Sequence, residues 1–136
     1  MTSIQVAQPA VAGVATKPCI LVVEDELLIR VVLSDELREA GHDVIEACDA
    51  DEALTVLKAR VHVDLVISDV RMPGSVDGLG LLAEIKSILP QLPVILTSGH
   101  LEAALALANG ATAFFSKPYA LDAVLGATRR TLGEMA

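Results

Sequence analysis

Carboxylates follow two apolar runs of strand length in this sequence. Residues 65–68 (LVIS) end on Asp69, and residues 20–23 (ILVV) end on the acidic triplet 24–26. In an open parallel α/β sheet, ligands bind in the crevice outside the carboxyl ends of the strands. If both runs are parallel strands, the acids that follow them lie in that crevice. We therefore predict that they take part in chemistry and not in packing.

Three of these acids, Glu24, Asp25 and Asp69, would repel one another in such a crevice. Their repulsion would raise the pKa of at least one carboxyl group unless a cation is bound. Mg²⁺ would remove the conflict, because it prefers oxygen ligands and is commonly held by one or two carboxylates together with phosphate oxygens. A simpler interpretation stays open, in which the acids at 24–26 only begin a helix whose dipole favours negative charge.

A hydroxyl and a cation follow two further apolar runs. Residues 94–96 are followed closely by Ser98, and residues 113–116 directly by Lys117. A lysine is a compact positive charge that can pair with Asp69 or with phosphoryl oxygens. Each residue also has a plain structural interpretation, since a serine before glycine is common in turns and a lysine before proline can be a solvated surface residue. Taken together, the four strand ends favour a site for a divalent cation and a phosphoryl group.

The rest of the chain supplies the elements that must hold these side chains. From Lys17 onward, short β-type runs alternate with segments of helical period, which is typical of repeated βα units and a parallel sheet. We predict five strands and five helices. The strands are expected near residues 19–23, 43–47, 65–68, 94–96 and 113–116, and the helices near 26–40, 50–57, 81–89, 101–108 and 121–132.

Two details of packing are also predicted. In the first helix, Leu28, Val32 and Leu33 recur at helical spacing and are expected to form the buried stripe. The histidines show no metal-binding spacing. His42 and His62 lie just before the second and third strands, where we expect surface residues.

Length and composition limit the class of protein. The 136 residues suit one domain, and the hydrophobic fraction of 53% indicates a globular core. The net charge of −8 argues against direct nucleic-acid binding, which needs Lys and Arg to neutralise phosphates. No apolar run approaches the roughly 20 residues of a membrane span. We expect a disordered tail over residues 1–16, a domain over 17–136, reduced core thiols at Cys19 and Cys48, and a cytoplasmic location.

Five sequence features, in this order, resemble the receiver domain of two-component response regulators. The first is Glu24-Asp25, the second is Asp69 with Met72-Pro73, and the third is Asp77-Gly78. The fourth is the segment 93–98, and the fifth is Lys117-Pro118. The resemblance implies a flavodoxin-like, doubly wound sheet of five parallel strands in the order 2-1-3-4-5. It also implies roles for individual residues: Asp69 as phosphoacceptor, Asp25 as a direct Mg²⁺ ligand, Glu24 as a ligand through water, the backbone carbonyl of Arg71 as a further ligand, Lys117 as a contact of the phosphoryl group, and Ser98 and Phe114 as switch residues.

The function implied by the resemblance is that of a single-domain response regulator. Asp69 would take a phosphoryl group from a sensor histidine kinase or a histidine phosphotransfer protein, with Mg²⁺ as cofactor. The protein would act on no other substrate, so we do not expect an enzyme. Its output would be a changed protein-binding surface on the fourth helix, fifth strand and fifth helix, or onward transfer of the phosphate. Arg71 and His100 flank the expected phosphoryl site and are candidates for setting the phosphoryl lifetime.

The sequence departs from the family pattern near the site. The loop over residues 74–76 is one residue longer than in many receivers, Gly99 replaces the common alanine, and the interval from Ser98 to Gly110 is short. Two other functions stay open. A receiver-fold module could bind partners without phosphorylation. A Mg²⁺-dependent phosphohydrolase with an Asp nucleophile would use similar groups, although such enzymes usually carry a second Asp where this chain has Arg71.

Overall fold

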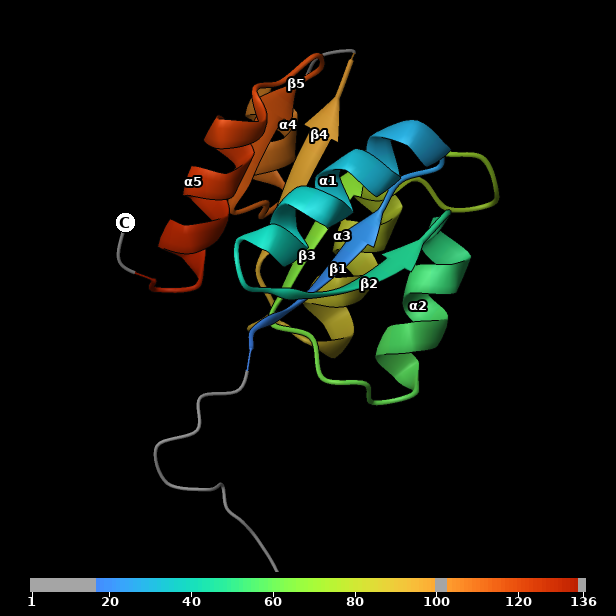
Figure 1. Ribbon diagram of the computed structural model, residues 1–136. Helices are drawn as coiled ribbons and strands as arrows, with labels where there is room; N and C mark the ends of the chain where they lie inside the picture. Colours follow the sequence, from blue (N-terminus) through green and yellow to red (C-terminus); the bar gives the residue numbers. More distant parts are fainter. Residues whose placement is uncertain (1–16, 100–102, 135–136) are drawn as a thin grey trace, which may run out of the picture.

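Five short strands form one parallel sheet in the computed structural model, which describes residues 17–99 and 103–134 (Figure 1). Neighbouring strands are all parallel, and their order is β2-β1-β3-β4-β5. The predicted doubly wound sheet and its strand order are therefore confirmed. The strands are β1 (Cys19–Val23), β2 (Asp43–Ala47), β3 (Leu65–Asp69), β4 (Val94–Ser98) and β5 (Ala113–Ser116).

Helices cover both faces of the sheet. In Figure 1, α1 and α5 lie on one face, and α2, α3 and α4 lie on the other. Within the described part of the chain, no helix is long and apolar enough to cross a membrane. The predicted tail over residues 1–16 lies outside the described residues. The helices are α1 (Leu27–Glu39), α2 (Ala50–Lys58), α3 (Gly78–Ile88), α4 (Ala103–Ala108) and α5 (Leu121–Thr131).

The core divides into two clusters because successive side chains of a strand point to opposite faces of the sheet. On β1, Leu21 and Val23 pack toward α2, α3 and α4, whereas Ile20 and Val22 pack toward α1 and α5. Both cysteines are free, as predicted, but they are half-buried and do not belong to the core. Strands β1, β3 and β4 occupy the middle of the sheet and are covered on both faces, which explains their nearly unbroken apolar sequences.

Side chains fix where two helices begin at the carboxyl edge of the sheet. Asp49 accepts a hydrogen bond from the backbone N–H of Glu52 at the start of α2. Asp77 accepts one from the N–H of Gly80 at the start of α3. Such caps satisfy donors that the first helical turn leaves unpaired. Both helices therefore begin at defined positions beside the strand ends.

The predicted buried stripe of the first helix is wrong in two of its three members. Leu33 is buried, but Leu28 is 75% exposed and Val32 is 43% exposed. Instead, α1 packs through Leu33 and Leu37, which are four residues apart. The first half of α1 carries apolar residues on several sides, so helical period could not identify its buried face.

His42, predicted to lie on the surface, is buried, and that prediction is wrong. Gly41 adopts a φ of 100°, a left-handed conformation that favours glycine, and turns the chain inward after α1. Nδ1 of His42 lies 3.1 Å from the carbonyl oxygen of Leu37, and its Nε2 lies 3.0 Å from Oε2 of Glu134. These contacts join the end of α1 to the chain after α5. The prediction for His62 is confirmed, since its side chain is 83% exposed.

Candidate functional site

Side chains from neighbouring strand ends meet at the carboxyl edge of the sheet. Backbone hydrogen bonds continue the ladder past the strands: the N–H of Val70 donates to the carbonyl of Thr97, and the N–H of Lys117 donates to the carbonyl of Ser98, both at 2.8 Å. The register places Asp69 opposite Thr97. The carboxylate, the hydroxyl and the lysine predicted from sequence therefore follow one another on β3, β4 and just after β5.

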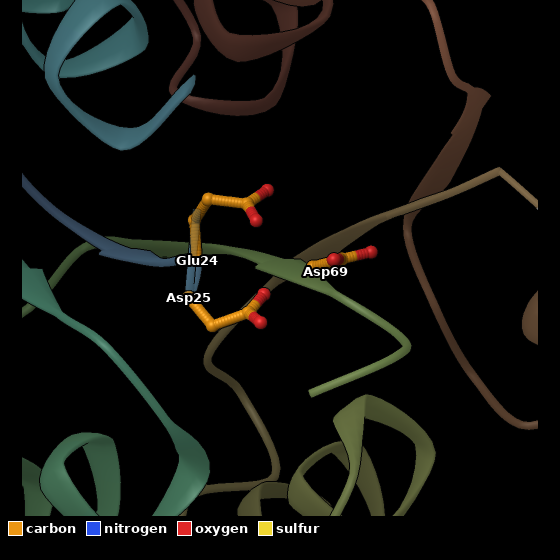
Figure 2. Close-up of side chains that lie close together, drawn as sticks. All are labelled: Glu24, Asp25 and Asp69. Atoms are coloured by element: carbon orange, nitrogen blue, oxygen red, sulfur yellow. The ribbon is translucent and has the colours of Figure 1, made fainter. Parts of the chain in front are cut away.

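Glu24, Asp25 and Asp69 form the acidic cluster of this edge. One carboxylate oxygen of each residue lies within 4.8 Å of those of the other two. Figure 2 shows the carboxylates of Glu24 and Asp25, just past the end of β1, turned toward the side on which Asp69 lies. All the donor atoms are carboxylate oxygens, which are the ligands that a hard cation such as Mg²⁺ prefers. The predicted grouping of the three acids is therefore observed, and the donor set fits this metal.

Lys117 brings a positive charge into contact with the acidic cluster. Its Nζ lies 2.7 Å from Oε1 of Glu24, 3.1 Å from Oδ2 of Asp69 and 3.9 Å from Oε1 of Glu26. The side chains of Glu24 and Asp69 are only 4% and 8% exposed, so little water screens these pairs. The lysine that the sequence placed after the fifth strand thus contacts one acid just past the end of β1 and another at the end of β3.

Burial and charge shift the pKa values of these groups in a consistent way. Burial raises the pKa of both Glu24 and Asp69, and their hydrogen bonds to Lys117 offset this only in part. Burial alone would lower the pKa of Lys117, yet its hydrogen bonds to Glu24 and Asp69 hold that pKa above its ordinary value. The lysine therefore stays charged, while two of the acids resist ionisation. A site with more carboxylates than one lysine can balance is suited to a further cation.

The acids differ in how their oxygens are already used. Oε1 of Glu24 accepts a hydrogen bond from Lys117, and Oε2 accepts one from the backbone N–H of Glu26 at 3.1 Å. Asp25, the next residue in the chain, is exposed. The implied division, in which Asp25 binds a metal directly and Glu24 binds it through water, fits this arrangement.

The loop after β3 lies against the acidic cluster. Arg71 is exposed and lines, together with Asp25, a shallow hollow of about 600 Å³. The N–H of Gly78 donates to the carbonyl of Val70 at 2.7 Å, which folds the loop back on itself. A Cβ at Gly78 would clash with the carbonyl oxygen of Asp69. Glycine is therefore needed here for the close approach of two backbone segments beside Asp69.

The two predicted switch residues lie on the strands beyond Asp69. Ser98 ends β4 and is 2% exposed. Phe114 in β5 is half-buried and packs against the cluster beneath α2, α3 and α4. Their positions agree with the resemblance, and their movement on phosphorylation stays a prediction. His100, a candidate for setting the phosphoryl lifetime, lies outside the described residues.

Two features beside the site were not predicted from the sequence. Arg30 donates a hydrogen bond from Nη1 to the carbonyl oxygen of Glu24 at 2.9 Å. A charged residue inside the apolar stretch 27–33 was the available signal for Arg30. The second feature is a largely apolar groove of about 460 Å³ that joins segments far apart in the sequence, so no local pattern could reveal it. This groove is lined by Glu26, Leu28, Ile29, Val32, Lys117, Pro118, Tyr119 and Leu121.

Comparison with curated proteins finds long regulators that share this region. The chain is 41% identical over 120 residues to the response regulator protein FleR of Pseudomonas aeruginosa. It is 38% identical over 116 residues to the C4-dicarboxylate transport transcriptional regulatory protein DctD of Rhizobium meliloti. These matches cover 85% and 83% of this chain but 25% of each relative. The chain thus spans about a quarter of the length of the curated relatives it matches.

Solved structures give the same result at the level of a single domain. The receiver domain of NtrX from Brucella abortus is 40% identical, with a TM-score of 0.78, and the match covers 85% of this chain and 99% of that domain. A response regulator receiver domain protein from Clostridium thermocellum matches with a TM-score of 0.79, 31% identity and coverage of 85% and 94%. The response regulator receiver domain family matches residues 20–129, which include the acidic cluster and Lys117. With its strand order and this match, the chain belongs to the response regulator receiver domain family.

Proposed function

We propose that this receiver accepts a phosphoryl group on Asp69 from a phosphohistidine, in a reaction that depends on Mg²⁺. The donor is a sensor histidine kinase or a histidine phosphotransfer protein. One observation carries the proposal: Lys117 contacts Asp69 inside an acidic cluster whose negative charge exceeds what the lysine can balance. Such a site suits the binding of a cation and then of a phosphoryl group.

The proposed reaction transfers the phosphoryl group between two side chains. A carboxylate oxygen of Asp69 attacks phosphorus, a P–O bond forms, the P–N bond to the donor histidine breaks, and its electron pair returns to the imidazole. Lys117 stays protonated, as its raised pKa indicates, and shifts from Asp69 to the phosphoryl oxygens. When bound, Mg²⁺ would neutralise charge on the transferring group. Asp25, Asp69 and the carbonyl of Arg71 would hold the ion directly, and Glu24 would hold it through water.

The donor protein is proposed to bind over the first turns of α1. Leu27 and Leu28 are 64% and 75% exposed, directly after the acidic cluster in the sequence. Leu28 also lines the apolar groove that reaches Lys117. Exposed apolar side chains gathered beside a reactive site are typical of protein-binding surfaces. A donor helix that places apolar residues in this groove would bring its phosphohistidine toward Asp69.

The output surface is proposed to lie on α4, β5 and α5. Leu105 and Leu107 of α4 are 46% and 51% exposed. Movement of Ser98 toward the phosphoryl group and of Phe114 behind it would change this surface. With a net charge of −8, the chain itself is not expected to bind DNA directly. The stand-alone organisation stays a prediction, because this chain spans about a quarter of the length of the curated relatives. The cytoplasmic location also stays a prediction.

Phosphorylation of purified protein by acetyl phosphate tests the proposal. Intact mass measured with and without Mg²⁺ should show a phosphoryl adduct that depends on the metal and is absent in Asp69→Asn. Asp43→Asn is the matched control, since Asp43 is an exposed acid at the opposite end of the sheet. An adduct of equal yield in Asp69→Asn would contradict the assignment of the phosphoacceptor. Absence of any adduct in the wild type, with partner binding retained, would favour the phosphorylation-independent module.

A further inference from the structure

Arg30 of α1 connects the edge strand β2 to the end of β1. Its Nη1 donates to the carbonyl oxygen of Glu24 at 2.9 Å, and its Nε donates to Oε1 of Glu46 at 3.2 Å. The Arg30 side chain is 16% exposed, so it bridges the two elements largely out of water. Arg38 holds the other oxygen of Glu46, at 3.2 Å from its Nη2. Arg30 is therefore held between the carbonyl of Glu24 and the carboxylate of Glu46, which Arg38 fixes in turn.

The carbonyl of Glu24 lies where the strand ladder stops. The N–H of Glu24 still donates to the carbonyl of Ala47, at 3.0 Å. β2 ends at Ala47, and in this register the next N–H to face β1 would be that of Asp49, which already lies in the turn before α2 as the N-cap of that helix. Arg30 thus supplies a donor to the Glu24 carbonyl at the point where the neighbouring strand turns away. This hydrogen bond is favoured, because a buried backbone carbonyl without a partner costs free energy.

This carbonyl belongs to the peptide plane that joins Glu24 to Asp25. Because the peptide unit is planar, a hydrogen bond at the oxygen also fixes the N–H of Asp25 and the direction in which the chain presents its carboxylate. We propose that Arg30 is a positioning residue for the metal-binding pair Glu24 and Asp25. This inference rests on the proposed function of the site as a Mg²⁺-dependent phosphoacceptor. Groups that orient metal ligands without touching the metal commonly change affinity by about 10- to 100-fold.

Arg38 provides the control that separates positioning from simple attachment of α1 to β2. It contacts the same glutamate, Glu46, and also the carbonyl of Val44, at 3.3 Å, but within the described part of the chain it makes no hydrogen bond or ion pair with β1. If Arg30 only ties the helix to the edge strand, Arg30→Met and Arg38→Met should have the same consequences. If Arg30 orients the acidic pair, only Arg30→Met should change the site.

The first measurement is made on the full chain without metal. In ¹H–¹⁵N spectra, the amide signal of Asp25 should shift in Arg30→Met, because the carbonyl of its own peptide unit loses a hydrogen bond, and should stay in place in Arg38→Met. Arg30→Lys keeps the charge and most of the apolar stem, and it should restore the signal in part. Arg30→Lys also provides the test if Arg30→Met does not fold. An unmoved Asp25 signal in both Arg30 variants would overturn the inference.

The second measurement is the Mg²⁺ dissociation constant by calorimetry. Arg30→Met should weaken binding by about tenfold, whereas Arg38→Met should bind like the wild type. Equal affinity in Arg30→Met and the wild type would also overturn the inference. A wild-type protein that binds no Mg²⁺ would count against the proposed function, and the metal-free spectrum would still decide whether Arg30 orients the Glu24–Asp25 peptide.

Discussion

The two ends of the sheet each hold a largely buried polar contact, but the two contacts are built differently. At the carboxyl edge, Lys117 faces Glu24 and Asp69, with Asp25 close by, so acids outnumber the cation. At the amino edge, His42 has a carbonyl oxygen on one ring nitrogen and Glu134 on the other. A polar contact in which both ring nitrogens have partners stabilises the fold. A cluster with more carboxylates than cations is instead suited to binding a further cation.

Lys117→Met should have the largest effect. It leaves two buried carboxylates without their cation, so we expect a loss of about 3 kcal/mol at neutral pH. The loss should shrink as the pH falls, because protonation of Glu24 and Asp69 removes the uncompensated charge. Urea unfolding without Mg²⁺ measures it, with the exposed Lys58→Met as control. Equal stability of both variants would show that the carboxyl edge needs no internal cation.

His42→Ala should rank second and should affect stability alone. It removes a buried ring and leaves the carbonyl of Leu37 and the carboxylate of Glu134 without that partner, which costs about 2 kcal/mol. Mg²⁺ affinity should equal that of the wild type, because the amino edge has no contact with the acidic cluster. His62→Ala is the control, since His62 is exposed. A change in Mg²⁺ affinity in His42→Ala would break the distinction between the two edges.

Asp69→Asn should act in the opposite direction and stabilise the metal-free protein. Burial raises the pKa of Asp69, which means that the folded state disfavours the ionised form. Asparagine removes that unfavourable charge while Lys117 keeps Glu24, so we expect a gain of about 1 kcal/mol at neutral pH. Thermal unfolding at fixed ionic strength measures the gain. A loss of stability would mean that the pair with Lys117 outweighs the burial of the carboxylate.

The same pKa shifts fix how stability depends on pH. The folded-state pKa values of Glu24 and Asp69 are raised, so the folded protein holds these protons more tightly than the unfolded chain. Their contribution is complete below the unfolded pKa values of about 4 and is lost as the pH rises through the raised values. Wild-type protein without metal should lose stability over this window, and Asp69→Asn should lose less. Saturating Mg²⁺ should remove much of the decline.

Asp25→Asn should have the smallest effect on the metal-free protein. Asp25 is exposed, so neutralising it should leave the free energy of unfolding unchanged. In contrast, it should weaken Mg²⁺ binding strongly, since it is the proposed direct ligand. Calorimetry and urea unfolding on the same sample separate the two effects, with Asp43→Asn as control. Unchanged Mg²⁺ affinity would remove Asp25 from the proposed ligand set.

The sequence predicted what is local and missed what depends on orientation. Apolar runs predicted the strands, and the acids or lysine directly after them predicted the grouping of Glu24, Asp69 and Lys117. The strand order was predicted only by the family resemblance. Periodicity failed in α1 because apolar residues on several sides do not tell which side is buried, as Leu28 shows. The role of Arg30 could not be read from its position either, because it depends on where a long side chain ends in three dimensions.

The contacts of Lys117 also have a consequence for folding. This lysine reaches Asp69 across 48 positions of the chain and Glu24 across 93. Contacts of such sequence separation form late, because loop-closure entropy must be overcome before they contribute. A nascent or partly unfolded chain in which β5 is unpaired would hold its acids without their lysine. Competence for the proposed phosphorylation would therefore be acquired cooperatively with the last strand, and an incomplete domain would lack it.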